Sequence, residues 1–127
     1  MVYLDTHVLI WLLEGRFDLF PEKVIQKINE NQLVISPIVE LELQLLNETG
    51  KLKVDAKSII TELEASIGIV RCKHPFHEVV HQAVQFGWTQ DMFDRIITAQ
   101  AAIKNSILIT KNPVIQFNYD RTYWEEM

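Results

Sequence analysis

Hydrophobic residues along this chain fall into two patterns, short continuous runs and longer stretches with helical spacing. The short runs are rich in aliphatic residues and predict buried strands, expected at 2–4, 33–35, 67–72 and 107–109, with 119–124 as a candidate fifth. The longer stretches predict helices, expected at 7–14, from 21 onward, and at 37–49, 55–66, 75–86 and 91–105. Strands that alternate with helices favour an α/β fold, here a three-layer α/β/α arrangement around a central parallel sheet of four to five strands.

Start and stop signals mark several of the predicted helices. Ser36 followed by Pro37 is a strong helix start, because the serine hydroxyl can cap the first turn and proline suits its first position. Gly15 and Gly50 are expected to end the helices that precede them. These signals support the order of elements that the hydrophobic pattern predicts.

Length and composition favour a single domain over residues 1–127. A chain of 127 residues with 48% hydrophobic residues is large enough to bury one core. Its charges are spread without long runs of one sign, so the composition gives no support for disorder. We therefore expect one ordered globular unit.

The charge balance limits how the protein could hold nucleic acid. With 12 basic and 17 acidic residues, its formal net charge is −5. Proteins that bind nucleic acid by releasing counterions from phosphates need positive charge at the contact. A phosphate-bearing substrate would therefore need a bound cation.

Cysteine usage and hydropathy favour a cytoplasmic protein with no membrane segment. The single cysteine, Cys72, cannot form a disulfide within the chain and is expected to be buried as a small hydrophobic residue. The apolar run from Val8 to Leu13 is much shorter than a bilayer span and follows Asp5 and His7 instead of a basic segment. We therefore expect neither a membrane helix nor a signal peptide.

Acidic residues stand where the predicted strands and helices meet. Asp5 follows the first strand, Glu42 lies early in the helix after the second, and Asp91 and Asp94 open the helix before the fourth. In an open parallel sheet the carboxyl ends of the strands share one edge, so these acids can converge in space. Such a cluster of like charges needs protons or a cation, and all-oxygen ligands suit Mg²⁺ or Mn²⁺.

Each acid also has a purely structural explanation. Asp5 could cap the first helix, a role that Thr6 could also fill, and capping is the favoured explanation for Asp91. Asp94 could favour the helix N-terminus and pair with Arg95. Glu42 alone would be an ordinary solvated residue. Only the joint pattern favours a metal site.

At this point three segments resemble the PIN-domain family, and specifically its VapC-type toxins. Val2-Tyr3-Leu4-Asp5-Thr6-His7-Val8-Leu9-Ile10-Trp11 resembles the strand, acid, threonine and apolar helix start of that family. Ser36-Pro37-Ile38-Val39-Glu40-Leu41-Glu42-Leu43 is similar to its second motif, in which Glu42, not Glu40, matches the glutamate of the family. Asp91-Met92-Phe93-Asp94-Arg95 resembles its third, with Met92 in place of proline. The resemblance covers nearly the whole chain in order.

The resemblance implies a fold, a reaction and partners. The fold is the PIN-like α/β/α fold, and the reaction is hydrolysis of an RNA phosphodiester that leaves 5′-phosphate and 3′-hydroxyl ends. Asp5 and Asp94 are then expected to bind Mg²⁺ or Mn²⁺ directly, while Glu42 ligates through water or orients the attacking water. A homodimer is also implied, together with a cognate antitoxin that blocks the acidic pocket, often with a basic side chain.

Five further residues are expected to support the site. The resemblance gives Thr6, Thr110 and Asn112 roles next to the ligands or the substrate, and Asp91 and Arg95 weaker supporting roles. Asn112 departs from the family, which usually carries an aspartate two residues after the threonine of the last core strand. An asparagine offers one neutral carbonyl oxygen, so a second metal would be held more weakly than the first.

One competing motif points to a different enzyme. His77-Glu78-Val79-Val80-His81 matches the zinc-peptidase helix motif, with two imidazoles one turn apart and a glutamate as base. Position 84 is Val84 instead of glycine, position 87 is Gly87 instead of histidine, and the helix at 91–105 has no glutamate to act as third ligand. The alternative to the zinc-peptidase interpretation is an ordinary helix, in which Val80 and Val84 face the core and the histidines are solvated.

Two more hypotheses keep the fold but change the function. The first is an RNA-binding or partner-binding module whose catalysis is weakened by the missing acid at Asn112. The second is a flap-type deoxyribonuclease, which would need extra elements to clamp DNA, and none is visible in a chain of 127 residues. Metal-dependent RNA cleavage separates the enzyme from the binding module.

Overall fold

The computed structural model describes residues 1–125 and has a parallel five-stranded sheet at its centre. The strands are β1 (Val2–Leu4), β2 (Leu33–Ile35), β3 (Val70–Arg71), β4 (Ile107–Ile109) and β5 (Thr122–Tyr123). They lie in the order β3-β2-β1-β4-β5, and every neighbouring pair is parallel. The register places Val2 beside Leu33 on one side and Ile107 on the other. The α/β class and the parallel sheet are confirmed.

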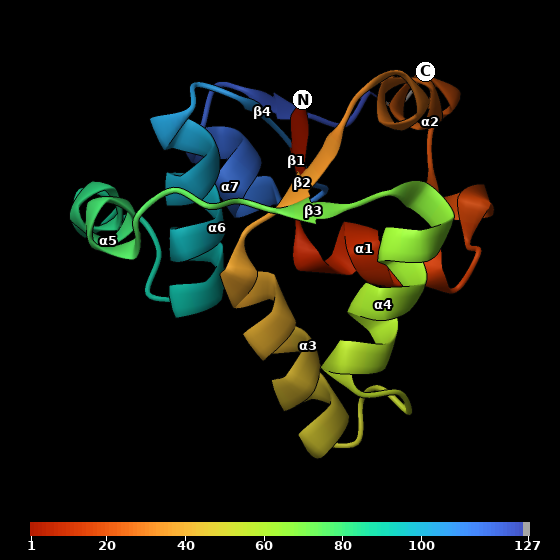
Figure 1. Cartoon of the computed structure of the whole chain (residues 1–127). Helices are drawn as coiled ribbons and strands as arrows, with labels where there is room; N and C mark the ends of the chain where they lie inside the picture. The colour runs from red at the N-terminus through yellow and green to blue at the C-terminus, as the bar shows by residue number, and fades with distance from the viewer. Residues whose placement is uncertain (126–127) are drawn as a thin grey trace.

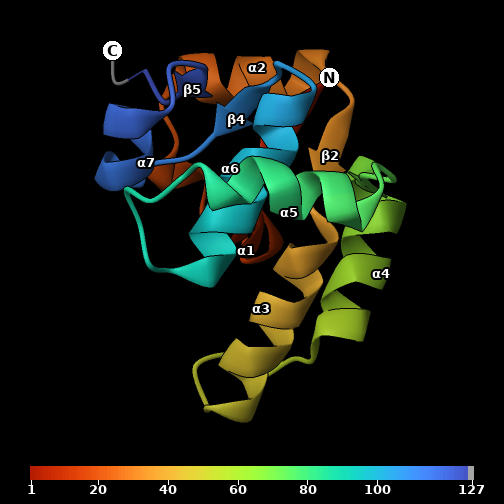
Figure 2. The same ribbon diagram turned by 90° about the vertical axis from the view of Figure 1, so that its left-hand side faces the viewer.

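Helices flank the sheet and connect its strands. They are α1 (Thr6–Leu13), the short 3-10 helix η1 (Phe17–Leu19), α2 (Glu22–Glu30), α3 (Pro37–Glu48), α4 (Ala56–Ile67), α5 (Phe76–Val84), α6 (Met92–Ile103) and α7 (Pro113–Asn118). Figures 1 and 2 show α3 and α4 side by side, projecting from the sheet, and α5 lying against α6. None of the described helices has both the length and the apolar character needed to span a membrane. The sequence pattern did not predict η1 or α7, which are both short.

The third strand is shorter than predicted because the preceding helix runs on. Helix α4 continues through Ile67 and ends at Gly68, whose backbone is left-handed with a φ of 69°. Glycine adopts this conformation without the steric cost of a Cβ atom. The strand therefore begins only at Val70, while Cys72 just beyond it is buried, as expected, and accepts a hydrogen bond from the hydroxyl of Tyr3 at 3.0 Å.

Helix α5 buries a different apolar face from the one that the sequence suggested, and α3 also leaves an apolar residue exposed. On α5, Val79 and Ala83 are buried while Val80 and Val84 are exposed, so the expectation that the latter pair faces the core is wrong. On α3, whose apolar positions include Leu41, that residue is 58% exposed while Val39 and Leu43 are buried. Each helix has apolar residues at helical spacing on more than one side, so periodicity alone cannot choose the side that packs.

Candidate functional site

The carboxyl ends of β1 and β4 place two polar residues next to each other. Asp5 follows β1 and Thr110 follows β4, and the backbone N–H of Asp5 donates to the carbonyl of Ile109 at 3.1 Å. These two strands are neighbours in the sheet. The chain continues from β1 to β2 on one side of this pair and from β4 to β5 on the other side. In α/β proteins this switch point is where ligands bind.

Asp5 is held rigidly and is only 5% exposed. Its Oδ1 accepts from the backbone N–H of Thr6 at 2.7 Å and its Oδ2 accepts from the hydroxyl of Thr110 at 2.6 Å. Burial raises the pKa of Asp5, and the two hydrogen bonds counter part of that effect. Asp5 therefore caps α1, as its structural explanation predicts, and also presents a buried carboxyl group at the switch point.

Glu42 reaches the same place from α3. The hydroxyl of Thr6 donates a hydrogen bond to Glu42 Oε1, so the residue after Asp5 links the two acids. Burial raises the pKa of Glu42, and the charge of Asp5 raises it further. These contacts bring together Asp5 and Glu42, which lie 37 positions apart in sequence.

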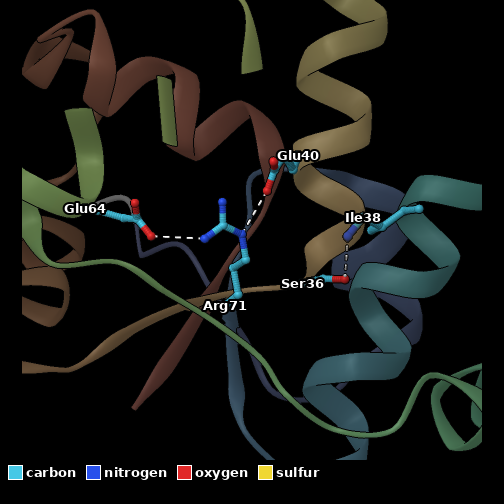
Figure 3. A network of polar contacts seen from close by, with 5 residues as sticks. All are labelled: Ser36, Ile38, Glu40, Glu64 and Arg71. Carbon is cyan, nitrogen blue, oxygen red and sulfur yellow. Dashed lines mark hydrogen bonds and ion pairs between the residues drawn. The ribbon is translucent and has the colours of Figure 1, made fainter. Parts of the chain in front are cut away.

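Glu40, two residues earlier on α3, points to a different side of the helix. Its Oε1 accepts from Arg71 Nε at 2.8 Å, and Arg71 also pairs with Glu64 at 3.0 Å (Figure 3). Residues two apart on a helix are separated by about 200° around its axis. Glu42, not Glu40, is therefore the α3 acid that joins Asp5.

Asp94 enters the cluster from the first turn of α6. Burial raises its pKa to about 7, with further contributions from the charges of Asp5, Asp91 and Glu42. The side-chain amide of Asn112 donates to Asp94 Oδ2 at 3.1 Å, which acts in the opposite direction. Four carboxyl groups from three separate segments thus influence one another electrostatically.

The carbonyl oxygen of Asn112 takes part in hydrogen bonds that cap the next helix. It accepts hydrogen bonds from the backbone N–H groups of Val114 at 2.9 Å and Ile115 at 3.3 Å, and so caps α7. The amide N–H₂ group is therefore the part of Asn112 that faces Asp94. Helix capping by the oxygen thus orients the amide in this structure, and the role of Asn112 toward a second metal remains a prediction.

Asp91 and Arg95 both have structural roles in α6. Asp91 Oδ1 accepts from the backbone N–H groups of Phe93 at 2.9 Å and Asp94 at 3.1 Å, which confirms Asp91 as the helix cap. The Arg95 guanidinium turns away from the acids. It donates to the carbonyls of Ala83 at 2.8 Å, Val84 at 3.2 Å and Thr89 at 3.3 Å. The expected Arg95–Asp94 pair is therefore wrong, since the backbone at the end of α5 takes up the guanidinium.

A surface cavity of about 400 Å³ opens over the acid cluster. All four acids line it together with Asn112, and it also contains His7, Trp11 and Lys111. Neither His7 nor Lys111 was predicted from the sequence to belong to the site. The position of Lys111, between Thr110 and Asn112, was the signal that could have identified it.

The cluster has the properties of a site for a hard divalent cation. Within residues 1–125, no ion pair joins any of its four acids to a lysine, arginine or histidine. Over the same residues, no three His, Cys, Asp or Glu side chains already surround a single point at which a metal could sit. Mg²⁺ commonly binds through only one or two carboxylates and keeps several waters, so the donor set fits such an ion with water completing its shell.

The fold and the site make this an α/β protein with an acidic site at the switch point of an open parallel sheet. Sequence comparison then identifies the family. The model of the PIN domain matches residues 2–118. The chain therefore belongs to the PIN-domain family.

Solved structures with the same fold cover almost the entire chain. Among them is VapBC2 from Rickettsia felis bound to a DNA fragment from its promoter (TM-score 0.65, 20% identity, covering 100% of this chain and 99% of that one). A toxin–antitoxin complex from Klebsiella pneumoniae is similar too (TM-score 0.65, 19% identity, 100% of both chains). VapBC-1 from nontypeable Haemophilus influenzae is similar as well (TM-score 0.66, 19% identity, covering 99% of this chain and 98% of that one). No curated protein sequence matches significantly.

Proposed function

We propose that this protein is a metal-dependent endoribonuclease and the toxin of a toxin–antitoxin pair. The observation that carries the proposal is the convergence of Asp5, Glu42 and Asp94 at one cavity without a neutralising ion pair among the described residues. Nucleases of the PIN family generally use divalent metal ions. The negative net charge of the chain is consistent with this dependence, because a cation would have to mediate contact with phosphate.

In this mechanism Asp5 and Asp94 would hold Mg²⁺ or Mn²⁺. The two hydrogen bonds to Asp5 fix its carboxyl group, so little conformational freedom is lost on binding. The hydrogen bond from the side-chain amide of Asn112 to Asp94 Oδ2 restrains Asp94 in the same way. When bound, the ion lowers the pKa of a ligated water and neutralises charge on the scissile phosphate.

Glu42 orients the attacking water. Thr6 fixes Glu42 Oε1, which leaves Oε2 to accept a proton or a hydrogen bond from that water. Lys111 lines the same cavity and would supply a positive charge for a substrate phosphate, while Trp11 would offer an aromatic face for a base. Attack of this water on the phosphorus would break the P–O3′ bond, leaving a 5′-phosphate, while the departing 3′ oxygen takes a proton from solvent to become the 3′-hydroxyl.

An antitoxin would inhibit this site by placing a basic side chain among the acids. Support comes from the similar structures, which include complexes of toxin and antitoxin. The cavity over the acids is large enough for a guanidinium group, which pairs well with carboxylates. We also propose a homodimer, on the basis of the family resemblance alone.

RNA cleavage with and without metal tests the enzyme proposal. Purified protein is incubated with single-stranded and hairpin RNA in EDTA, Mg²⁺ or Mn²⁺, with duplex and flap DNA as parallel substrates. We expect cleavage of RNA only with metal, and loss of that cleavage in Asp5→Asn and Asp94→Asn. Cleavage confined to DNA would contradict the proposed substrate.

One specific observation favours the binding module as the second candidate. Asn112 presents an amide where the family usually has a carboxylate, which removes one negative charge from the cluster. If neither metal supports cleavage of any RNA while RNA or an antitoxin still binds, the module with weakened catalysis is the correct description.

A further inference from the structure

Three of the four histidines lie together at α5, in a cavity separate from the acid site. His77 and His81 are on α5 and His74 lies two residues before its start. With Glu78 they line a hollow of about 440 Å³, which shares no lining residue with the acid cavity. The proposed nuclease mechanism makes no use of this cluster.

The spacing of these residues places them on two adjacent sides of the start of α5, about 100° apart around its axis. His77 and His81 are four residues apart, so their imidazoles stand one turn apart on the same face. His74 and Glu78 are also four apart, and His74 Nε2 lies 3.1 Å from Glu78 Oε1. The other oxygen of Glu78 lies 3.8 Å from His77 Nε2. One carboxylate therefore sits between two imidazole nitrogens.

The cluster is accessible and able to rearrange. The side chain of His77 is 84% exposed, and that of Glu78 is 52% exposed. The part of the chain that the structure describes has no three such side chains already arranged around a common metal position. The three imidazoles would therefore meet at one ion only after His77 and His81 change rotamer, which exposed side chains do on a fast timescale.

We propose that His74, His77 and His81 bind a divalent transition-metal ion, Zn²⁺, at the surface of α5, with Glu78 as the adjoining carboxylate. Imidazole nitrogen is a favoured ligand of Zn²⁺ and a poor ligand of Mg²⁺, so this site and the acid cluster select different ions. Three imidazoles leave the fourth tetrahedral position to water. The charge of Glu78 partly neutralises the ion and fixes the orientation of the imidazoles.

The site binds metal without the peptidase chemistry that its sequence motif suggests. The remaining lining residues of the hollow, Gln82 and Ile103, provide no further acid. Glu78 contacts His74 instead of standing free to act as a base. The metal would instead join the segment before α5 to the helix itself and stabilise that junction.

Zn²⁺ binding to the untagged chain tests this proposal. Isothermal titration with ZnCl₂ is done in excess Mg²⁺, so that Mg²⁺ competes for the acid cluster, and we expect about one equivalent to bind. The double variant His77→Ala/His81→Ala should lose at least about 100-fold in affinity, and Glu78→Gln about 10-fold. Two controls should keep Zn²⁺ binding: Asp94→Asn in the acid cluster, and Gln85→Ala at the exposed end of α5.

Histidine NMR signals of the unaltered protein provide a second measurement that does not depend on any variant folding. Addition of Zn²⁺ should shift the ring signals of His74, His77 and His81 and leave His7 unchanged. The proposal is overturned if the chain takes up no Zn²⁺, if the double variant binds it as well as the unaltered protein, or if only His7 shifts. The test does not involve RNA cleavage, so its result is independent of the proposed nuclease activity.

Discussion

The side-chain amide of Asn112 donates a hydrogen bond to Asp94 Oδ2 at 3.1 Å, while the carbonyl oxygen of the same amide caps α7. Because both ends of the amide are engaged, its orientation is fixed. Asn112 therefore restrains Asp94 with a neutral donor, where a carboxylate would add a further negative charge to the cluster. This contact links the end of β4 to the start of α6.

Asn112→Asp should destabilise the metal-free protein and strengthen its binding of metal. Aspartate caps helices as well as asparagine does, so α7 keeps its cap while the cluster gains a charge and Asp94 loses its donor. We expect the free energy of unfolding without metal to fall by about 1–2 kcal/mol. Urea unfolding in EDTA measures this, and titration with Mn²⁺ measures affinity and stoichiometry.

Asn112→Ala is the matched control for the charge effect. It removes the cap and the donor without adding a charge, and should cost about 1 kcal/mol with or without metal. If Asn112→Asp were as stable in EDTA as the original protein and bound Mn²⁺ no more tightly, the electrostatic account of this contact would be wrong.

The stability of the metal-free protein should fall as the pH rises toward neutrality. The pKa of Asp94 is raised from 3.8 to about 7 in the folded state, so the folded protein holds this proton more tightly than the unfolded chain does. Stability from the bound proton is fully present below 3.8 and is lost as the pH rises through about 7. The raised pKa values of Asp5 and Glu42 act in the same direction.

Urea unfolding in EDTA at about pH 5 and about pH 8 checks this dependence. Solvent screens the partly exposed Asp94, so we expect its contribution to be on the order of 1–2 kcal/mol. Asp94→Asn should flatten the pH profile, and Mg²⁺ should restore stability at the higher pH. A profile that Asp94→Asn leaves unchanged would show that this carboxyl group is not responsible.

Glu42→Gln and Glu40→Gln form a matched pair on one helix. Glu42 lines the acid cavity, so the amide should lower the rate of metal-dependent RNA cleavage by about 100-fold or more. Glu40 pairs with Arg71 at a partly exposed site, and its loss should cost less than about 1 kcal/mol of stability and leave cleavage unchanged. Equal effects of the two variants on the cleavage rate would contradict the assignment of Glu42.

Arg95→Ala should affect stability without affecting metal binding. The guanidinium donates to three backbone carbonyls at the end of α5 and in the following loop. Its removal leaves these groups with fewer partners, so we expect a loss of about 1–3 kcal/mol and faster hydrogen exchange in α5. Mn²⁺ affinity should stay within about twofold, since Arg95 does not contact the acids. A large loss of Mn²⁺ affinity in a folded variant would show that Arg95 contributes to the metal site.

Apart from the short helices η1 and α7, the sequence by itself determined the order of the elements and indicated which acids could come together. Short aliphatic runs and the Ser36-Pro37 helix start are local signals, and the parallel strands follow from their alternation with helices. The position of Asp5 directly after β1 then places it at the carboxyl edge of the sheet. These features depend on backbone geometry that a few neighbouring residues fix.

Only the tertiary structure decided which side of each helix packs and what each polar side chain contacts. Val79 is buried and Val80 exposed because α5 packs on α6, and that choice depends on residues outside α5. The orientations of Arg95 and Asn112 depend likewise on the end of α5 and the start of α7. Long-range hydrogen bonds and packing contacts are set by the whole fold, so no local pattern in the sequence determines them.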